Sequence, residues 1–433
     1  EAWVEAEPQA RREALRATFA TALISQAQER PTVVFIDDCQ WLDADSAELI
    51  DALVRTVAGT RVLVLLAYRP DFEPPWEDPF LGLDLWRLTM EETGEVVGSL
   101  MAARGLVEAE TTVDRSMAEA VWHKTQGNPF FIDQLVTALT ERAATTGTPT
   151  IDFRRGRLLI TEEELGRLAP DSVEEILLAR MDKLPSEPRN LLQAASVAML
   201  GRRFRRSALQ QVLDRDDLAA PLAQLVEGEF IHLEERGEGD EEYAFDHALA
   251  RDVAYGALLR TERRRLHGRM GEFIEQRYAG SLEAYLDDLS LHFYNSTCAD
   301  KALKYLPRSA ARAAAVYSNQ QAIVQYKRAI EKAGELGADA NNQRLEVLVG
   351  LTTVQTLVGD AELVGYLEQR LILAQSLDDE EEQINALFML ARRHSEMGEF
   401  GAAQGYFEQA RQAFERLGDW TGVRDTLFGV GNL

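Results

Sequence analysis

Cysteine is scarce in this chain, which argues against two kinds of stabilisation. Only Cys39 and Cys298 occur among 433 residues. They lie far apart, so the sequence offers neither the close spacing of a zinc site nor a disulfide framework. This usage suits a reducing compartment, and we expect a cytoplasmic protein.

Long apolar runs and positive charge are also lacking. The longest apolar run, Val62 to Tyr68, is far shorter than the roughly 20 residues of a membrane span. Lys and Arg number 46 against 72 Asp and Glu, which gives a net charge of −26. Such a charge repels phosphate backbones and anionic membrane surfaces. We therefore expect no membrane partner and no nonspecific binding to nucleic acid.

The length indicates several folded domains, because single cores rarely grow beyond about 250–300 residues. The apolar pattern predicts an α/β block at 1–144, a linker at 145–170, a helical block with two short strands at 171–277, and a helical block at 278–433. The expected fold class is multidomain, α/β followed by all-α.

The most informative stretch runs from Thr32 to Ser46 and reads TVVFIDDCQWLDADS. Its five apolar, mostly β-branched residues predict a buried parallel strand, and Asp37 and Asp38 follow directly. Paired carboxylates at the mouth of a sheet can hold Mg²⁺ through water and position an attacking water. A core strand followed by a polar turn would give the same pattern.

A second strand is predicted from Arg61 to Tyr68, after a helix from Ser46 to Val57 for which Asp45 is the expected N-cap. Strand, helix and strand at this spacing predict a right-handed parallel crossover. Because the carboxyl ends of parallel strands share one edge, Arg69 should lie near the two aspartates. Arg69 could contact a phosphate or remain a solvated loop residue.

Amphipathic helices predicted at 88–106 and 113–126 would form a small helical lid. The turn Gly127-Asn128-Pro129 then begins another helix, which Asn128 can cap and in which Pro129 suits the first position. The turn could be a capped helix start and nothing more.

Residues 171–277 predict helices with two short strands at 230–233 and 243–245. Three helices and a two-stranded wing form a winged-helix layout, which often binds DNA. The stretch 210–229 is acidic here, which favours packing against protein over direct DNA binding. His247, within the string FDHALARDVAYGALL, could contact a ligand or could be a capping or core histidine.

The last block carries a repeat. Tyr326, Leu367 and Phe407 recur at spacings of 41 and 40 residues, and small residues such as Ala391 and Ala403 accompany them. This pattern predicts tetratricopeptide-like repeats, which form an α-solenoid and present a concave surface to a protein or peptide partner. A plain helical bundle is the alternative.

Together, the string TVVFIDDCQWLDADS, the string YRPD, the Gly127-Asn128-Pro129 turn and the string around His247 resemble STAND-class P-loop ATPases. These are signal-transduction relatives of the AAA+ family. The resemblance extends over nearly the whole chain. It implies a partial P-loop NTPase parallel sheet with a helical lid, a winged helix and a repeat solenoid.

The resemblance also implies site residues for ATP or ADP with Mg²⁺. Asp37 would hold the metal, Asp38 would position water and Arg69 would sense the γ-phosphate. Gly127 and Pro129 would form the turn against adenine or ribose, and His247 would read the β-phosphate of ADP. The string around His247 departs from the Met-His-Asp order of better-known relatives.

The phosphate-binding loop of that family, Gly-x-x-x-x-Gly-Lys-Ser/Thr, is missing. No lysine follows a glycine anywhere in the sequence. Either the sequence is truncated upstream of Glu1, or the core is degenerate and does not hydrolyse ATP. In both cases we expect this chain alone to bind ATP weakly or not at all.

The function that the resemblance implies is a nucleotide-dependent switch, as in regulators linked to adenylate or guanylate cyclases. Bound ADP would keep the protein closed, and exchange for ATP, biased by a ligand on the repeats, would open it and permit homo-oligomers. A fragment of a LuxR-type transcription activator and a repeat scaffold with a dead ATPase core are the alternatives.

Overall fold

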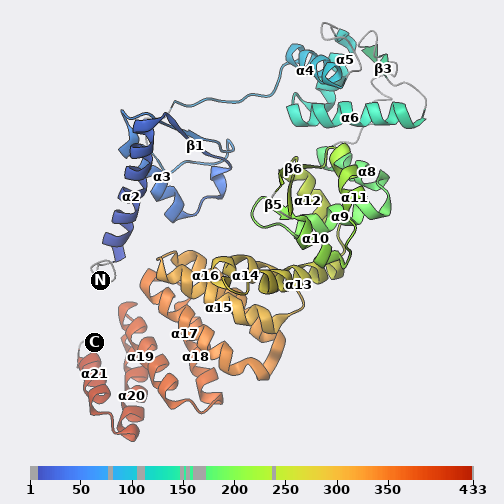
Figure 1. Ribbon diagram of the computed structural model, residues 1–433. Helices are drawn as coiled ribbons and strands as arrows, with labels where there is room; N and C mark the ends of the chain where they lie inside the picture. Colours follow the sequence, from blue (N-terminus) through green and yellow to red (C-terminus); the bar gives the residue numbers. More distant parts are fainter. Residues whose placement is uncertain are drawn as a thin grey trace. The chain divides into compact units, whose positions relative to one another are not determined.

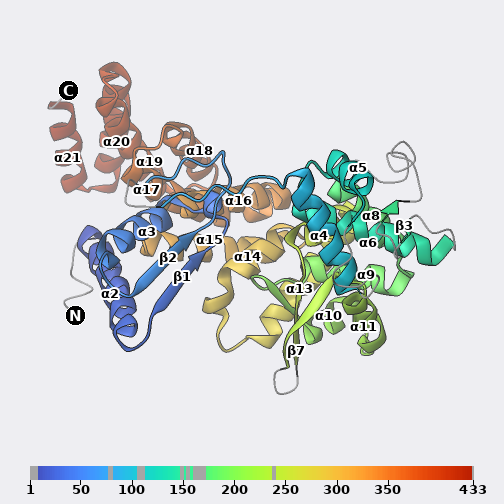
Figure 2. The same ribbon diagram turned by 90° about the horizontal axis from the view of Figure 1, so that it is seen from above.

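The computed structural model of the chain describes residues 8–76, 81–104, 113–146, 151–152, 157–158, 172–236 and 240–431. The chain divides into two compact units, Glu1–Asp84 with Ala313–Ser318, and Leu85–Arg312 with Asn319–Leu433. Figures 1 and 2 show their helices and strands in two views.

The first unit contains a two-stranded parallel sheet. β1 (Thr32–Ile36) pairs with β2 (Val62–Leu66) over the full length of both strands. α2 (Pro8–Glu29) precedes β1, and α3 (Ala44–Val57) connects the two strands. The predicted order of strand, helix and strand is confirmed, together with the parallel pairing.

The two helices cover one face of this sheet with apolar side chains. The contacting residues are Ala20, Leu53 and Val57, which are buried, and Leu23, Ile24, Val62 and Val64, which are partly buried. Alternate strand residues face the other way, and Val33 and Phe35 are 59% and 62% exposed. The prediction of a buried strand is therefore wrong on one face, because the period of two leaves that face to solvent.

α3 begins two residues earlier than predicted, and a different aspartate caps it. The Asp43 carboxylate accepts a hydrogen bond from the N–H of Ser46 at 2.7 Å, whereas Asp45 lies inside the helix. An N-cap needs a side-chain oxygen within reach of the second or third N–H of the helix. The early start of α3 gives that position to Asp43.

In the second unit, the two predicted lid helices are α4 (Met90–Ala103) and α5 (Arg115–Thr125), and the helix predicted after them is α6 (Pro129–Thr146). The three helices together are called the lid below. Thr89 and Glu92 form a reciprocal capping box at the start of α4. β3 (Ile151–Asp152) and β4 (Arg157–Leu158) pair antiparallel as a short hairpin within the predicted linker. The turn of that hairpin and the rest of the linker lie outside the described residues.

Residues 172–277 form helices around a small antiparallel sheet. The helices are α8 (Val173–Lys183), α9 (Ser186–Val197), α10 (Arg206–Leu213), α11 (Ala219–Glu227), α12 (Ala248–Gly256) and α13 (Arg260–Arg277). The strand order is β5-β7-β6, with bounds Arg203–Arg205, Glu241–Phe245 and Ile231–Arg236. Sequence reasoning missed β5, because three residues rich in arginine give no strand signal. The winged-helix assignment stays a prediction.

One hydrophobic core joins the lid to this region. Its members include Phe131, Ile132, Leu135 and Val136 of α6, Ile176 and Leu177 of α8, and Ala250 of α12. The lid and the helices after the linker therefore bury apolar surface against each other. The exact domain boundaries stay predictions.

The last part of the chain is a series of packed helices, coloured yellow to red in Figure 1. They are α14 (Leu286–Tyr294), α15 (Ala299–Ala315), α16 (Asn319–Leu336), α17 (Asn341–Val358), α18 (Leu363–Ser376), α19 (Glu380–Glu396), α20 (Phe400–Leu417) and α21 (Trp420–Gly431). From α16 onward each helix contacts the next. The repeat residues Tyr326, Leu367 and Phe407 are all buried.

Aromatic rings in these helices fill spaces that glycines leave. A Cβ on Gly350 would lie 2.6 Å from the hydroxyl oxygen of Tyr326, and a Cβ on Gly429 would lie 2.5 Å from Cζ of Phe407. Each ring therefore needs a residue without a side chain on the helix that follows. The same arrangement in two places favours repeated packing over a plain bundle.

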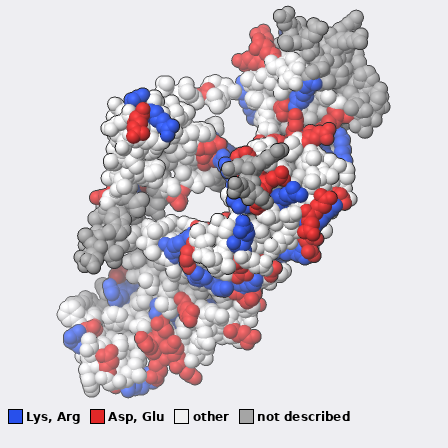
Figure 3. Space-filling view, in the orientation of Figure 1, with Lys and Arg blue, Asp and Glu red and all other residues white. Residues whose placement is uncertain are grey.

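The acidic residues that exceed the basic ones in this sequence are visible on the surface. Figure 3 shows acidic side chains gathered over the repeat helices, and the first turn of α19 contains Glu380, Glu381 and Glu382. Acidic residues in a first turn also interact favourably with the helix dipole. Within the described ranges, no helix is both long and apolar enough to cross a membrane.

Two buried histidines meet where α12, α13 and α14 join. Nδ1 of His267 lies 3.0 Å from Nδ1 of His292, and the hydroxyl oxygen of Tyr255 lies 3.0 Å from Nε2 of His267. Burial lowers the pKa of His267 to about 4, assisted by the charge of Arg263. Burial and then the charge of His267 lower the pKa of His292 to about 3. Both rings are therefore neutral at pH 7.

We expect the free energy of unfolding to fall as the pH drops from about 6.5 toward 4. Unfolded histidines, with a pKa near 6.5, bind protons in this window that the folded pair cannot bind, at a cost of up to about 2 kcal/mol per histidine at pH 5. Thermal denaturation between pH 7.5 and 5 measures this loss. His292→Leu should reduce the loss, and His123→Gln, at an exposed position, should not. An unchanged loss in His292→Leu would contradict the assignment.

Candidate functional site

The carboxyl ends of β1 and β2 form one candidate site, which lies within the first unit. Asp37 and Asp38 follow β1 directly, and Arg69 lies three residues after the end of β2. The N–H of Ala67 donates to the last carbonyl of β1, and the N–H of Cys39 donates to the carbonyl of Ala67, both at 2.9 Å. These bonds keep the two loops at one edge of the sheet, as predicted.

A side-chain amide links the two loops. Nε2 of Gln40 donates to Oδ1 of Asp38 at 2.9 Å, and the N–H of Arg69 donates to Oε1 of Gln40 at 3.2 Å. Asp38 has a left-handed backbone, with φ 55° and ψ 42°, and its N–H donates to Oδ1 of Asp37 at 3.0 Å. A residue with a Cβ adopts this conformation at an energetic cost. The surrounding hydrogen bonds offset that cost and orient Asp38.

Sequence reasoning assigned no role to Gln40. The available signal was an amide two residues after a carboxylate, a spacing that many turns share. For Arg69, the structure fixes the backbone but leaves the side chain exposed, and among the described residues its guanidinium makes no hydrogen bond or ion pair. Its role as a phosphate contact stays a prediction.

The thiol of Cys39 is packed in the apolar core at this edge, and its surroundings disfavour the thiolate. Cys39 is fully buried, and its Sγ lies 3.4 Å from the carbonyl oxygen of Ile36. Burial raises the pKa of the thiol, and the charges of Asp37 and Asp38 raise it further. A neutral thiol is a poor nucleophile and a poor metal ligand.

The chemistry of Asp37 and Asp38 fits Mg²⁺. Magnesium keeps several waters and is commonly held by one or two carboxylates together with substrate phosphates. No group of three or more His, Cys, Asp and Glu with metal-binding geometry occurs among the described residues. A magnesium ion at this edge would therefore take its remaining ligands from water and phosphate.

A separate group of candidate residues lies at the turn before α6, in the other unit. The carbonyl of Gly127 accepts a hydrogen bond from the N–H of Leu88 at 2.9 Å. Gly127 has φ 70°, and a Cβ there would lie 2.1 Å from the carbonyl oxygen of Leu88. Oδ1 of Asn128 accepts bonds from two N–H groups of the first turn at 3.0 and 3.2 Å, and Pro129 begins α6. The predicted cap is confirmed, and Gly127 has a structural role independent of any ligand.

His247 lies beside this turn. Its ring centroid is 4.2 Å from that of Phe130, the residue after Pro129, with an interplanar angle of 52°. His247 occupies the N-cap position of α12 but makes no side-chain capping bond, and it is exposed. It is therefore neither a core residue nor a side-chain cap, which leaves its ring accessible to a ligand.

The predicted site residues fall into two groups. Asp37, Asp38 and Arg69 share the sheet edge of the first unit, whereas Gly127, Pro129 and His247 share the starts of α6 and α12 in the second. Within each group, residues distant in sequence lie together. Their ligand roles stay predictions.

Comparison with known proteins found one family model that is similar to part of the first unit. A model of the AAA ATPase domain matches residues 2–65. This stretch, which contains β1, α3 and nearly all of β2, is similar to an AAA ATPase domain. An uncharacterized protein of Rhizobium meliloti (strain 1021) is 24% identical over 273 residues, which cover 62% of this chain. The aligned part is 25% of that protein, so the chain spans about a quarter of this relative.

Two solved structures are loosely similar. One is a STAND protein with a tetratricopeptide repeat sensor from Pyrococcus horikoshii, with a TM-score of 0.39 and 11% identity, covering 95% of this chain and 72% of that one. The other is aspartyl phosphate phosphatase F from Bacillus subtilis, with a TM-score of 0.29 and 12% identity, covering 60% of this chain and 69% of that one. At these scores the likeness does not define the fold of this chain.

Gly127→Ala should lower the free energy of unfolding by about 2–4 kcal/mol. The left-handed backbone alone costs about 1–2 kcal/mol with a Cβ, and the clash with Leu88 adds to that cost. Gly398→Ala is the matched control, because Gly398 has φ 78° with open space around its Cβ position. Urea denaturation measures both variants, and equal losses would show that the contact with Leu88 contributes nothing.

Proposed function

We propose that this chain is a nucleotide-dependent regulatory module that binds ATP or ADP with Mg²⁺. The observation that carries the proposal is the sheet edge at which Asp37 and Asp38 lie beside the loop of Arg69. The stretch that provides this edge up to β2 is similar to an AAA ATPase domain. Paired acids at the carboxyl end of a parallel strand are the metal-binding element of phosphoryl-transfer sites.

In this proposal Asp37 holds the magnesium ion, mainly through water, and Asp38 positions the attacking water. Gln40 orients Asp38 through its amide, at 2.9 Å. The same amide anchors the backbone of Arg69 and leaves its guanidinium exposed to meet a phosphate. The phosphates of the nucleotide carry the negative charge that the magnesium ion and the Arg69 guanidinium would contact.

The second group of residues would read the nucleotide state. Pro129 offers a rigid apolar surface to the base or ribose, next to the tight turn at Gly127. The exposed ring of His247, which rests on Phe130, offers a donor to the β-phosphate of ADP. A contact made with ADP and altered with ATP would bias the protein between two states.

The repeats would supply the partner site. A groove of about 540 Å³ lies between α15 and α17, within the usual size range of ligand pockets. Its lining includes Leu303, Pro307, Tyr326 and Val347, with charges from Asp300, Lys304, Arg308 and Glu346. Walls of both charge signs around an apolar floor suit a peptide segment of a partner protein. Homo-oligomers on activation belong to the same proposal.

We expect weak binding of Mg·ATP and Mg·ADP by this chain, with dissociation constants of roughly millimolar order, because no phosphate-binding loop assists the two aspartates. Mn²⁺ in place of Mg²⁺ allows the ternary complex to be measured through the relaxation rate of water protons. Asp37→Asn should weaken metal–nucleotide binding at least tenfold.

The matched control is Asp51→Asn, which removes a half-buried carboxylate of α3 that pairs with Arg55 at 3.0 Å. It should leave binding unchanged. Equal binding by Asp37→Asn and the unmodified chain would show that the sheet edge is not the metal site. Micromolar affinity for Mg·ATP would overturn the expectation that the missing loop matters.

A further inference from the structure

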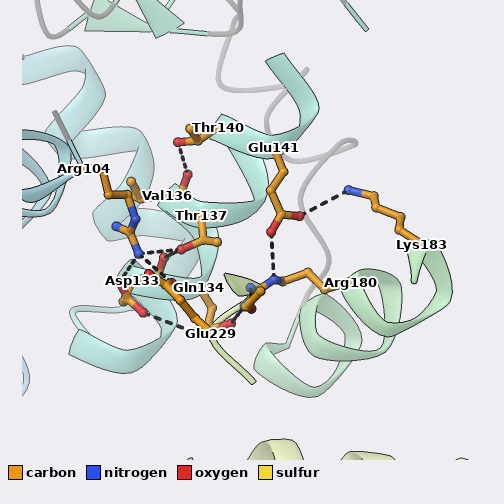
Figure 4. A network of polar contacts seen from close by, with 11 residues as sticks. Arg104, Asp133, Gln134, Val136, Thr137, Thr140, Glu141, Arg180, Lys183 and Glu229 are labelled. Atoms are coloured by element: carbon orange, nitrogen blue, oxygen red, sulfur yellow. Dashed lines mark hydrogen bonds and ion pairs between the residues drawn. The ribbon is translucent and has the colours of Figure 1, made fainter. Parts of the chain in front are cut away.

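A buried arginine joins the lid to the helices that follow the linker. Arg180 of α8 has a side chain that is only 3% exposed. Figure 4 shows it facing α6, with its guanidinium among polar groups of that helix. A buried charge of this kind persists only when hydrogen bonds replace its water.

Each edge of the Arg180 guanidinium has an acceptor. Nη1 donates to Oε1 of Gln134 at 2.6 Å, and Nε donates to Oε1 of Glu141 at 3.2 Å, both on α6. Nη2 donates to the carbonyl of Gly228 at 2.7 Å, in the turn that leads into β6. The guanidinium carbon also lies 4.9 Å from the centroid of the Phe230 ring. One side chain therefore binds three elements together.

A second arginine, Arg104, contacts α6 on the side opposite Arg180. Nη2 of Arg104, at the end of α4, donates to Oδ1 of Asp133 at 2.9 Å and to Oγ1 of Thr137 at 2.8 Å. The same nitrogen lies 3.5 Å from Oε2 of Glu229. The turn at 228–229 is thus held to α6 by two arginines, as Figure 4 shows.

The same interface contains the surface on which His247 rests. Phe131, Ile132 and Leu135 of α6 share their hydrophobic core with α8 and α12. The first turn of α6 also presents Phe130 to His247, with ring centroids 4.2 Å apart. Displacement of α6 would take the side chains of Gln134 and Glu141 away from the Arg180 guanidinium and would leave it only the carbonyl of Gly228. Because Phe130 belongs to α6, the same displacement would move its ring relative to His247.

We propose that Arg180 is a positioning residue, which with Gln134, Glu141 and the carbonyl of Gly228 forms a joint that fixes α6 and so builds the Phe130–His247 surface. The guanidinium is planar and presents its donors in a fixed fork, so the bonds form together in one arrangement and are lost together. The joint therefore behaves as a two-state element, closed when its acceptors are in place and open when α6 moves away.

The regulatory consequence rests on the proposed function, because it supposes that nucleotide contacts His247 and the turn at Pro129. A ligand on that surface would stabilise the closed joint, and opening the joint would dismantle the ligand site. The existence of the joint does not depend on any ligand.

Backbone hydrogen exchange, followed by mass spectrometry without nucleotide, tests the joint. Arg180→Met and Gln134→Met should each accelerate exchange at least tenfold in α6 and in α12. Exchange in α19 and α20 should stay unchanged and serves as the internal reference. Arg180→Lys should also accelerate exchange, because one ammonium group cannot reach acceptors on both sides.

Lys183→Met is the matched control. Lys183 lies on the same helix and pairs with the same Glu141, but at 3.8 Å and with a side chain that is 54% exposed. This variant should exchange like the unmodified chain. If α6 exchanges in both Arg180→Met and Gln134→Met at the rate of the unmodified chain, the proposal of the joint is wrong. If Arg180→Met unfolds the whole chain, the comparison of Gln134→Met with Lys183→Met decides.

Repeating the measurement with millimolar Mg·ADP separates the two proposals. Slower exchange at α6 and α12 in the unmodified chain, lost in Gln134→Met, supports the joint as the element that positions the site. Equal slowing in Gln134→Met would overturn that role. No slowing in the unmodified chain would count against the proposed function alone, since the nucleotide-free result stands by itself.

Discussion

A guanidinium that is taken out of water must have its donors satisfied, and the arrangement of α6, α8 and the turn before β6 follows from this constraint at Arg180. Its acceptors come from α6 and from the turn before β6, so these elements must meet where the fork of the guanidinium allows. Apolar packing alone tolerates small shifts, because hydrophobic contacts have little directionality. The buried polar contacts fix the position of α6 relative to α8 and to the turn before β6.

The first unit depends on a different constraint, the pairing of parallel strands. Register places the ends of β1 and β2 at the same edge, and the bonds through Ala67 extend that pairing into the loops. Side chains that follow the strands therefore converge whatever their separation in sequence. Gln40 then sets the local geometry, because its amide can accept from one loop and donate to the other.

Small residues govern the repeat helices. Gly350 and Gly429 lack the side chains that would collide with Tyr326 and Phe407, so neighbouring helices approach closely around each ring. The buried pair of His267 and His292 lies at the transition into these helices, and it is kept neutral by burial. Polar groups without charge can be buried at lower cost, which suits a junction between packed helices.

Local signals were enough to predict most helices and both strands of the first unit. The period of the apolar residues and the helix-terminal residues are properties of the chain itself. The sequence also predicted that Asp37, Asp38 and Arg69 meet, because parallel pairing obliges them to. It could not show that one face of the sheet is exposed, since an apolar run reads alike whether one face or both are covered. The strand β5 escaped notice for a different reason, because three residues rich in arginine give no strand signal.

Tertiary structure alone decided which residues orient the site. Gln40 binds Arg69, which lies 29 residues away, and Arg180 binds Gln134, which lies 46 residues away. The rings of His247 and Phe130 meet although 117 positions separate them. No local pattern encodes such pairs, because each depends on the packing of whole helices and strands. The sequence by itself determined the elements and the edge at which acids gather. The fold determined their partners, because hydrogen bonds and ring contacts act only across distances that folding creates.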